Sequence, residues 1–179
     1  MARFWRISSP QFVSRRPASG FTLLELLIGM AVVGVITAFA LPNFTEMMRK
    51  ARLNSLSSTF VASLNLARSE AVKRGKNVTV CRRNSSANSC GGDWMQGWII
   101  HEGTYAAAPA AAILRTQDAP SGTSTTLSGG TSFANSITFA PSGRVAAAGT
   151  FTLCDSVIQK QVQITITLSG RFRTSEGTC

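Results

Sequence analysis

The chain carries one dense block of apolar residues near its start, and the rest of the sequence is more evenly mixed. Residues 21–41 read FTLLELLIGMAVVGVITAFAL and contain a single charged residue, Glu25. A helix of this length rises about 31 Å, which is enough to cross the hydrocarbon core of a bilayer. The pattern therefore predicts that residues 21–41 form the transmembrane half of a helix.

A second helical pattern follows the apolar block, with a different distribution of polar residues. Apolar residues recur every three or four positions, at Leu53, Leu56, Phe60, Leu64, Ala67 and Ala71. This spacing places them on one helix face, which usually packs against a protein core. Pro42 predicts a kink or a short break, and the sequence KRG at 73–75 predicts the helix end. We expect residues 42–75 to form the amphipathic half of the same long helix.

Beyond residue 75 the pattern becomes that of short strands separated by polar turns. Residues 77–81 (NVTVC) alternate between polar and apolar positions, and a second apolar run lies within 91–103. Residues 103–136 are rich in Ala, Gly, Ser and Thr and predict one short strand, at 113–115, among loops. Further strands are expected at 151–153 and within 157–168. The pattern predicts a β-rich globular domain over residues 76–179.

The last third of the chain contains a short internal repeat. The segments ITFAPSGRV (137–145) and ITITLSGRF (164–172) share the pattern I-T-x-x-x-S-G-R followed by an apolar residue. Each predicts a strand that runs into a Ser-Gly turn. With the long helix before them, these strands give the fold class α+β.

Four cysteines follow the apolar block, at Cys81, Cys90, Cys154 and Cys179. An even number of cysteines beyond a membrane segment indicates an oxidising compartment and two disulfides. Zinc is the alternative, but no two cysteines lie within four positions of each other, so we expect no metal site. A bridge between Cys81 and Cys90 would close a polar loop, and one between Cys154 and Cys179 would tie the C-terminus to an earlier strand. Four cysteines allow three pairings, and the sequence does not choose among them.

Charge and composition mainly argue against an enzymatic function. The formal net charge is +10, and a basic surface is compatible with a polyanion, an acidic partner or simple solvation. The chain has one histidine, His101, and its acidic residues show no motif-like spacing for acid–base chemistry. We therefore expect no catalytic residues, no cofactor and no enzymatic activity.

The start of the apolar block carries a motif of its own. Gly20 is followed by FTLLE, which resembles the signal of prepilins and pseudopilins. The resemblance implies that residues 1–20 are a leader removed by a prepilin peptidase, and that Phe21 becomes an N-methylated N-terminus. It also implies that Glu25 neutralises an N-terminal amine in the filament, because either charge buried alone would be very costly. The alternative is an ordinary signal anchor with an incidental glutamate.

Features of the β-rich region narrow this resemblance. The segments DWMQGWII and FAPSGR, with an SGR turn before a terminal cysteine, resemble the GspH/FimT/FimU group of minor pilins and pseudopilins. The resemblance implies a pilin-like fold, with the helix packed on an antiparallel β-rich domain. It implies a single pass through the inner membrane with the C-terminal domain in the periplasm, and later incorporation into a pilus or pseudopilus. The implied partners are the peptidase, membrane lipid and other minor and major pilins or pseudopilins.

Three functions follow from this resemblance. The first is a minor type IV pilin that helps to prime or cap the pilus, with roles in assembly, twitching and DNA uptake. The second is a GspH-type pseudopilin of type II secretion. The third is a DNA-binding minor pilin for natural transformation, because GRFR at 170–173 is similar to a pattern in FimT-type proteins. A membrane-anchored periplasmic enzyme is a further alternative, but the sequence shows no set of catalytic residues for it.

The DNA hypothesis names four basic residues. Arg171 and Arg173 would lie on the same side of a strand, about 7 Å apart, which approximates the phosphate spacing along one DNA strand. Arg144 and Lys160 are further candidates that no motif names. The alternative is a solvated hairpin with surface arginines.

Overall fold

The computed structural model describes residues 20–84, 89–105, 112–120 and 124–179, and for residues 39–43 it describes the backbone alone. The chain divides into two compact units, one ending at Pro42 and the other running from Asn43 to Cys179. The predicted leader, residues 1–20, lies almost entirely outside the described residues. Each unit is described below by itself.

One long helix, α1 (Leu23–Arg74), passes through the boundary between the units. It begins two residues later than predicted, because the Thr22 hydroxyl caps its first turn by accepting a hydrogen bond of 3.2 Å from the backbone N–H of Glu25. It ends at Gly75, whose φ of 64° stops the helix as the sequence predicted. Of the kink or short break predicted at Pro42, the break is absent, because the helix assignment runs through this residue without interruption. Within the described residues, no helix combines the length and the apolarity needed to cross a membrane.

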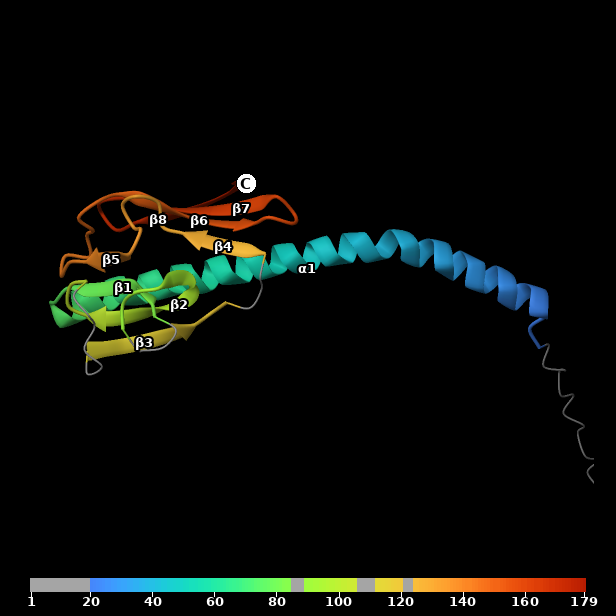
Figure 1. Ribbon diagram of the computed structural model, residues 1–179, viewed down its shortest axis with the longest axis horizontal. Helices are drawn as coiled ribbons and strands as arrows, with labels where there is room; N and C mark the ends of the chain where they lie inside the picture. Colours follow the sequence, from blue (N-terminus) through green and yellow to red (C-terminus); the bar gives the residue numbers. More distant parts are fainter. Residues whose placement is uncertain (1–19, 85–88, 106–111, 121–123) are drawn as a thin grey trace, which may run out of the picture. The chain divides into compact units, whose positions relative to one another are not determined.

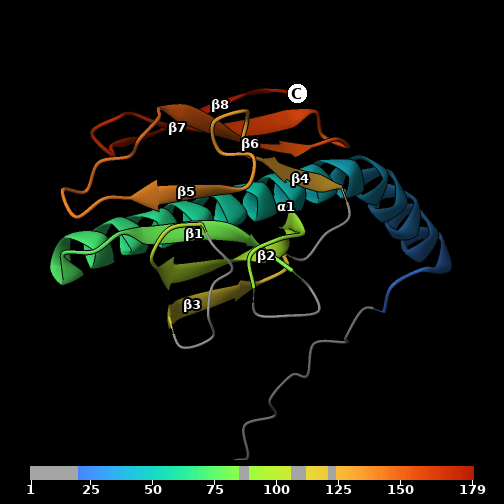
Figure 2. The same ribbon diagram turned by 60° about the vertical axis from the view of Figure 1, so that its left-hand side comes forward.

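After the helix, the described residues of the second unit form two antiparallel sheets of four strands each, joined by turns and loops (Figures 1 and 2). The first sheet has the strand order β3-β2-β1-β5, and its strands are β1 (Val78–Arg83), β2 (Asp93–Glu102), β3 (Ile113–Asp118) and β5 (Ser136–Phe139). The second sheet has the order β4-β6-β7-β8, and its strands are β4 (Thr125–Ser128), β6 (Gly149–Asp155), β7 (Lys160–Ile166) and β8 (Phe172–Thr178). This arrangement confirms the predicted fold class, a helix packed on an antiparallel β-rich domain.

The core lies where α1 meets both sheets. Figures 1 and 2 show the part of α1 beyond Asn43 running along the two sheets. Phe60 is fully buried there, and its ring makes edge-to-face contacts with Trp98 of β2 at 5.0 Å and with Phe151 of β6 at 4.7 Å. The helix face predicted from the spacing is buried as well: Leu53, Leu64, Ala67 and Ala71 belong to the same hydrophobic cluster. One helix face therefore holds the two sheets together.

Strand β4 is the element that the sequence analysis missed, because residues 103–136 were expected to hold a single strand at 113–115. Only Leu127 of β4 is buried, and it pairs with Leu153 of β6. A four-residue strand with one apolar side chain gives almost no periodic signal. Its pairing with β6, rather than its own residues, makes it a strand.

Candidate functional site

The N-terminal motif lies where the chain enters α1. Gly20 and Phe21 precede the helix, and both are exposed, with 82% of the Phe21 surface accessible. The peptide bond between them is therefore outside regular secondary structure, where a peptidase can reach it. Glu25 is exposed in the first turn of α1, at the positive end of the helix dipole.

The apolar side chains that follow this motif are also exposed. More than half of the surface of each of these side chains is accessible: Leu23, Leu24, Leu26, Leu27, Ile28, Met30, Val32, Val33, Val35 and Ile36. A continuous apolar surface of this kind marks an interaction with lipid or with other proteins. The described side chains of the first unit therefore form an exposed apolar surface suited to binding.

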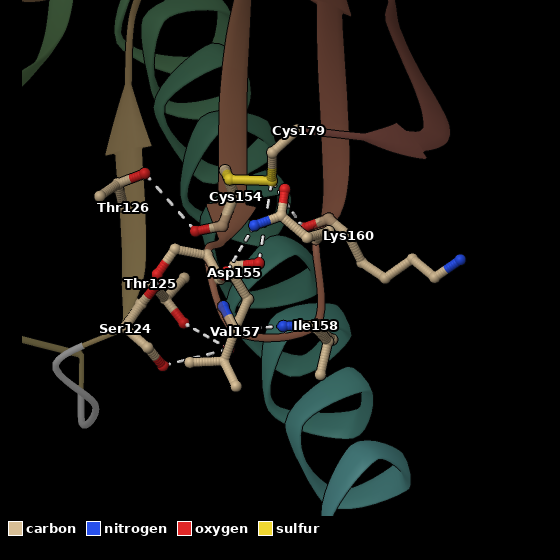
Figure 3. Close-up of a disulfide and its surroundings, with 11 residues drawn as sticks. Ser124, Thr125, Thr126, Cys154, Asp155, Val157, Ile158, Lys160 and Cys179 are labelled. Atoms are coloured by element: carbon tan, nitrogen blue, oxygen red, sulfur yellow. Dashed lines mark hydrogen bonds between the residues drawn. A yellow bond between two sulfur atoms is a disulfide. The ribbon is translucent and has the colours of Figure 1, made fainter.

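Of the three possible cysteine pairings, the structure contains the one with a Cys81–Cys90 and a Cys154–Cys179 bridge. Cys81 in β1 is bonded to Cys90, with 5.6 Å between their Cα atoms. Cys154 in β6 is bonded to Cys179, with 5.9 Å between their Cα atoms, and Figure 3 shows this bridge joining the chain end to the second sheet. The described residues contain no free cysteine.

A buried carboxylate lies beside the second disulfide, and sequence reasoning had treated it as one of several scattered acids. Asp155 is 2% exposed and accepts hydrogen bonds from the backbone N–H of Val157 at 3.0 Å and the Ser124 hydroxyl at 3.3 Å (Figure 3). The Arg49 guanidinium of α1 lies 3.9 Å from the same carboxylate. Asp155 therefore connects the β6–β7 turn, the start of β4 and the helix.

The internal repeat forms two equivalent turns, here called the paired turns (residues 140–144 and 167–171). In each, the first N–H donates to the carbonyl of the fifth residue, at 2.9 and 3.1 Å, and the glycine N–H donates to the first carbonyl, at 2.8 Å in both. Gly143 and Gly170 have φ angles of 72° and 71°. The repeat in the sequence is therefore a repeat in the backbone.

A helix residue links the paired turns. The Arg68 Nε donates to the Gly143 carbonyl at 3.1 Å, and its Nη2 donates to the Ser169 carbonyl at 3.2 Å. The turns also touch each other, because a Cβ added to Gly170 would lie 2.2 Å from the Gly143 carbonyl oxygen. No motif pointed to Arg68, since its partners lie 75 and 101 residues away along the chain.

The structure brings three of the four candidate DNA-binding residues to one place. Arg144 and Arg171 end the paired turns, and Arg173 lies at the start of β8; all three are exposed. Phe172, between the last two, is half-buried against Phe139, so the arginines on either side of it face outward. Within the described residues, none of the three arginine side chains forms an ion pair.

Lys160 is not part of this group. It begins β7, where it lies opposite Thr178, whereas Ile166 at the other end of β7 lies opposite Phe172. Six residues along a strand span about 20 Å. The exposed arginines and Lys160 therefore lie at opposite ends of the same strand pair.

Ion pairs connect the end of α1 to the end of β2. Glu70 pairs with Arg74 within the helix, and Arg74 also lies 3.5 Å from Glu102, which accepts a hydrogen bond from Lys76. The hydrogen bond from Arg74 lowers the pKa of Glu70, and the hydrogen bond from Lys76 lowers the pKa of Glu102. Arg74 and Lys76 are exposed and the two glutamates are half-buried at the surface, so these ion pairs are well solvated and contribute little to stability.

A long helix that starts at a Gly-Phe junction and leads into antiparallel sheets closed by disulfides is the arrangement of pilin-like subunits. A protein-family model described as Type II transport protein GspH matches residues 56–170, and one described as the Prokaryotic N-terminal methylation motif matches residues 15–41. The first match covers more than half of the chain. The chain therefore belongs to the GspH family, whose members are structural subunits of pilin type.

Known structures and relatives agree with this assignment. Two crystal structures of the type IV minor pilin FimU from Pseudomonas aeruginosa resemble the fold. The first has a TM-score of 0.57 at 24% identity and covers 71% of this chain and 90% of FimU. The second has a TM-score of 0.53 at 25% identity and covers 69% and 92%. A curated relative, the fimbrial protein EcpB of Eikenella corrodens, is 49% identical over 35 residues. That match spans 20% of this chain and 22% of EcpB.

Proposed function

We propose that this chain is a minor pilin that is incorporated into a type IV pilus, where it helps to prime or cap the filament. The observation that carries the proposal is the exposed Gly20–Phe21 junction, followed by Glu25 and an apolar helix surface. The exposed apolar surface that follows Phe21 would attach the chain to the inner membrane, with the β-rich unit in the periplasm, where disulfides form. In the filament the same apolar surface would pack against the helices of neighbouring pilins.

Processing at Gly20 is the first requirement of this function. We expect Gly20→Val to block removal of the leader in cells that have a prepilin peptidase, because the added side chain occupies the cleavage position. An immunoblot should show the full-length precursor in place of the shorter mature chain. Ser19→Val, one position earlier, is the matched control and should be processed. A mature band of normal size from Gly20→Val would contradict the proposed cleavage site.

A substitution at Glu25 tests incorporation of the chain into the pilus separately from removal of the leader. We expect Glu25→Gln to leave membrane insertion unchanged and to reduce recovery in sheared pili at least about tenfold, since an uncompensated N-terminal amine inside the filament costs several kcal/mol. Glutamine also serves at this position of a capping box, so the helix start is preserved. Glu46→Gln, at an exposed acid further along α1, is the matched control. Wild-type recovery of Glu25→Gln in the pili would refute the charge-pairing role.

The GspH family match also supports a pseudopilin of type II secretion. The two assignments differ in the filament that receives the chain. Cells that carry both systems allow the two assignments to be distinguished. Sheared pili and overproduced pseudopili are collected as separate fractions, and each fraction is probed for this chain by immunoblot. Recovery only with pseudopili would replace the first assignment by the second.

A second candidate function is phosphate-backbone binding to DNA, and the observation in its favour is the group formed by Arg144, Arg171 and Arg173. Their three guanidiniums are exposed and, among the residues that the structure describes, have no acidic partner. Such groups can contact phosphates, and these contacts are indifferent to base sequence. The paired turns hold two of these arginines in equivalent backbone positions. The proposed ligand is double-stranded DNA.

The arginine group gives a quantitative expectation. Replacing both Arg171 and Arg173 by glutamine should weaken DNA binding and lower the slope of log K against log salt by about 2, because about 0.9 counterions are released per phosphate contact. Fluorescence anisotropy of a labelled duplex with the full-length protein in detergent measures both quantities. Lys160→Gln, at the far end of β7, is the control and should bind like the wild type. Equal binding by the double variant would eliminate this function.

A further inference from the structure

Three potential metal ligands meet in the first sheet, although the sequence spacing had argued against a metal site. They are Cys81 on β1, Cys90 in the loop before β2, and His101 on β2. The two sulfur atoms and a ring nitrogen of His101 all lie within 4.8 Å of one another. In the structure the sulfurs form a disulfide, so this group becomes a possible metal site only when that bond is reduced.

Backbone pairing holds the three residues in place independently of the disulfide. Cys81 lies opposite Ile99, and His101 follows two residues later on β2, so both side chains are on the same face of the sheet. Cys90 forms a β-bridge with Arg83. Beside that bridge, the N–H of Gly91 donates to the Arg82 carbonyl at 2.9 Å, and the N–H of Asn84 donates to the Ser89 carbonyl at 3.0 Å. None of these backbone contacts involves a sulfur atom.

The His101 ring already has the orientation of a metal ligand. Its Nδ1 lies 3.1 Å from the Glu102 carbonyl oxygen, and its Nε2 lies 3.5 Å from the Cys90 sulfur. A neutral imidazole that donates its Nδ1 proton to the carbonyl directs the lone pair of Nε2 toward the sulfur. Metal-bound histidines characteristically donate their other ring N–H to a backbone carbonyl or carboxylate in this way. The ring is 1% exposed, so the packing around it fixes this orientation.

The distances are compatible with a zinc ion. In a tetrahedral site a thiolate sulfur and an imidazole nitrogen lie about 3.5 Å apart and two thiolate sulfurs about 3.8 Å apart, given zinc bonds of roughly 2.3 and 2.0 Å. The observed separation of Cys90 Sγ and His101 Nε2 is 3.5 Å. Cys81 Sγ lies within 4.8 Å of the same ring, and the two sulfurs would have to move apart once their bond is broken.

We propose that Cys81, Cys90 and His101 bind a zinc ion when their disulfide is reduced. A dithiol reductant passes two electrons and two protons to the disulfide and is itself oxidised to a disulfide. Zinc then displaces one proton from each thiol, and these two protons go to solvent, while neutral His101 contributes the lone pair of Nε2. Two thiolates and an imidazole suit zinc and leave one position for an exogenous ligand. The ion would then take over the cross-link between β1 and the following loop in the reduced state.

The chain contains its own control for this proposal. The second disulfide, Cys154–Cys179, has no histidine among its contacts, and within the described residues the only group able to hold a metal is Cys81, Cys90 and His101. If the site is specific, a metal ion should bind to the reduced Cys81–Cys90 pair and not to the reduced Cys154–Cys179 pair. Non-specific binding by thiols would occur at both pairs.

The experiment uses the full-length protein in detergent, reduced with a trialkylphosphine and desalted under nitrogen. Phosphine becomes its oxide with oxygen from water and adds no competing thiol. We expect one equivalent of Co²⁺ to give thiolate charge-transfer absorption, and Zn²⁺ to displace it. Cys154→Ser/Cys179→Ser should retain this signal, whereas Cys81→Ser/Cys90→Ser should lose it. His101→Gln should weaken Co²⁺ binding at least about tenfold, since one of three ligands is lost.

A second measurement keeps the result independent of variant stability. Zinc should protect Cys81 and Cys90, but not Cys154 and Cys179, from alkylation in the reduced wild-type chain, as read by mass spectrometry. The oxidised wild type should bind no Co²⁺. No absorption change in the reduced wild type, equal affinity in His101→Gln, or zinc protection of both cysteine pairs alike would each overturn the proposal.

Discussion

Replacing Phe60 by alanine is expected to destabilise the β-rich unit by about 3–5 kcal/mol, the usual cost of truncating a buried phenylalanine. The ring is fully buried and touches Trp94 and Trp98 in the first sheet and Phe151 in the second. Its loss leaves a cavity at a point where the helix contacts both sheets. Urea unfolding of the purified chain in detergent, followed by tryptophan fluorescence, measures the change.

The same helix offers a matched control for this substitution. Phe44 is 59% exposed, so Phe44→Ala removes the same atoms from a site with little packing. We expect that variant to unfold within about 0.5 kcal/mol of the wild type, as surface substitutions usually do. If both substitutions gave equal, small losses, Phe60 would not be the contact that joins the two sheets.

The paired turns lead to the second large effect, an expected loss of about 2–5 kcal/mol for Gly170→Ala. Two costs combine at this position. A left-handed φ of 71° costs an alanine about 1–2 kcal/mol. In addition, the new Cβ would lie 2.2 Å from the carbonyl oxygen of Gly143, a backbone atom, and relieving such overpacking typically costs another 1–3 kcal/mol.

Two other glycines separate these costs. Gly75 has a φ of 64° and no atom within 4 Å of an added Cβ, so Gly75→Ala measures the backbone strain alone. At Gly143 the nearest atoms are side-chain atoms, Arg68 Nε at 3.1 Å and Val72 Cγ2 at 3.2 Å, which can shift by a few tenths of an ångström. The expected order of destabilisation in urea is Gly75, then Gly143, then Gly170. An alanine at Gly170 that cost no more than one at Gly75 would show that the turns do not press on each other.

The structural features that were predicted best from the sequence are those determined by residues close together along the chain. The spacing of Leu53, Phe60 and Leu64 identified the buried face of α1, because residues three and four apart share one side of a helix. The repeated S-G-R segments identified the paired turns, since a glycine with positive φ is a local requirement. These features arise within a few residues and leave a pattern in the sequence.

The sequence failed where distant segments determine the outcome. Strand β4 forms through its pairing with β6, and Arg68 finds its partners in two turns that are far away along the chain. Lys160 was grouped with the arginines by charge alone, but the pairing of β7 with β8 puts it at the opposite end of the sheet. His101 reaches Cys90 only because β1 and β2 pair in one particular register. None of these contacts has a local signature.

The hydrogen bonds of Arg68 differ in kind from the ion pairs at the end of α1. Its two acceptors are backbone carbonyls, which do not titrate at any pH a cell encounters. Glu70 and Glu102 have lowered pKa values, so their pairing stabilises the fold above the ordinary carboxyl pKa and is lost as the pH falls. At acidic pH the ion pairs between α1 and β2 should therefore weaken, whereas the hydrogen bonds from Arg68 to the paired turns should persist. Protection from amide exchange, relative to the intrinsic rate at each pH, should therefore fall near Glu102 but not at Gly143 and Gly170 as the medium is acidified.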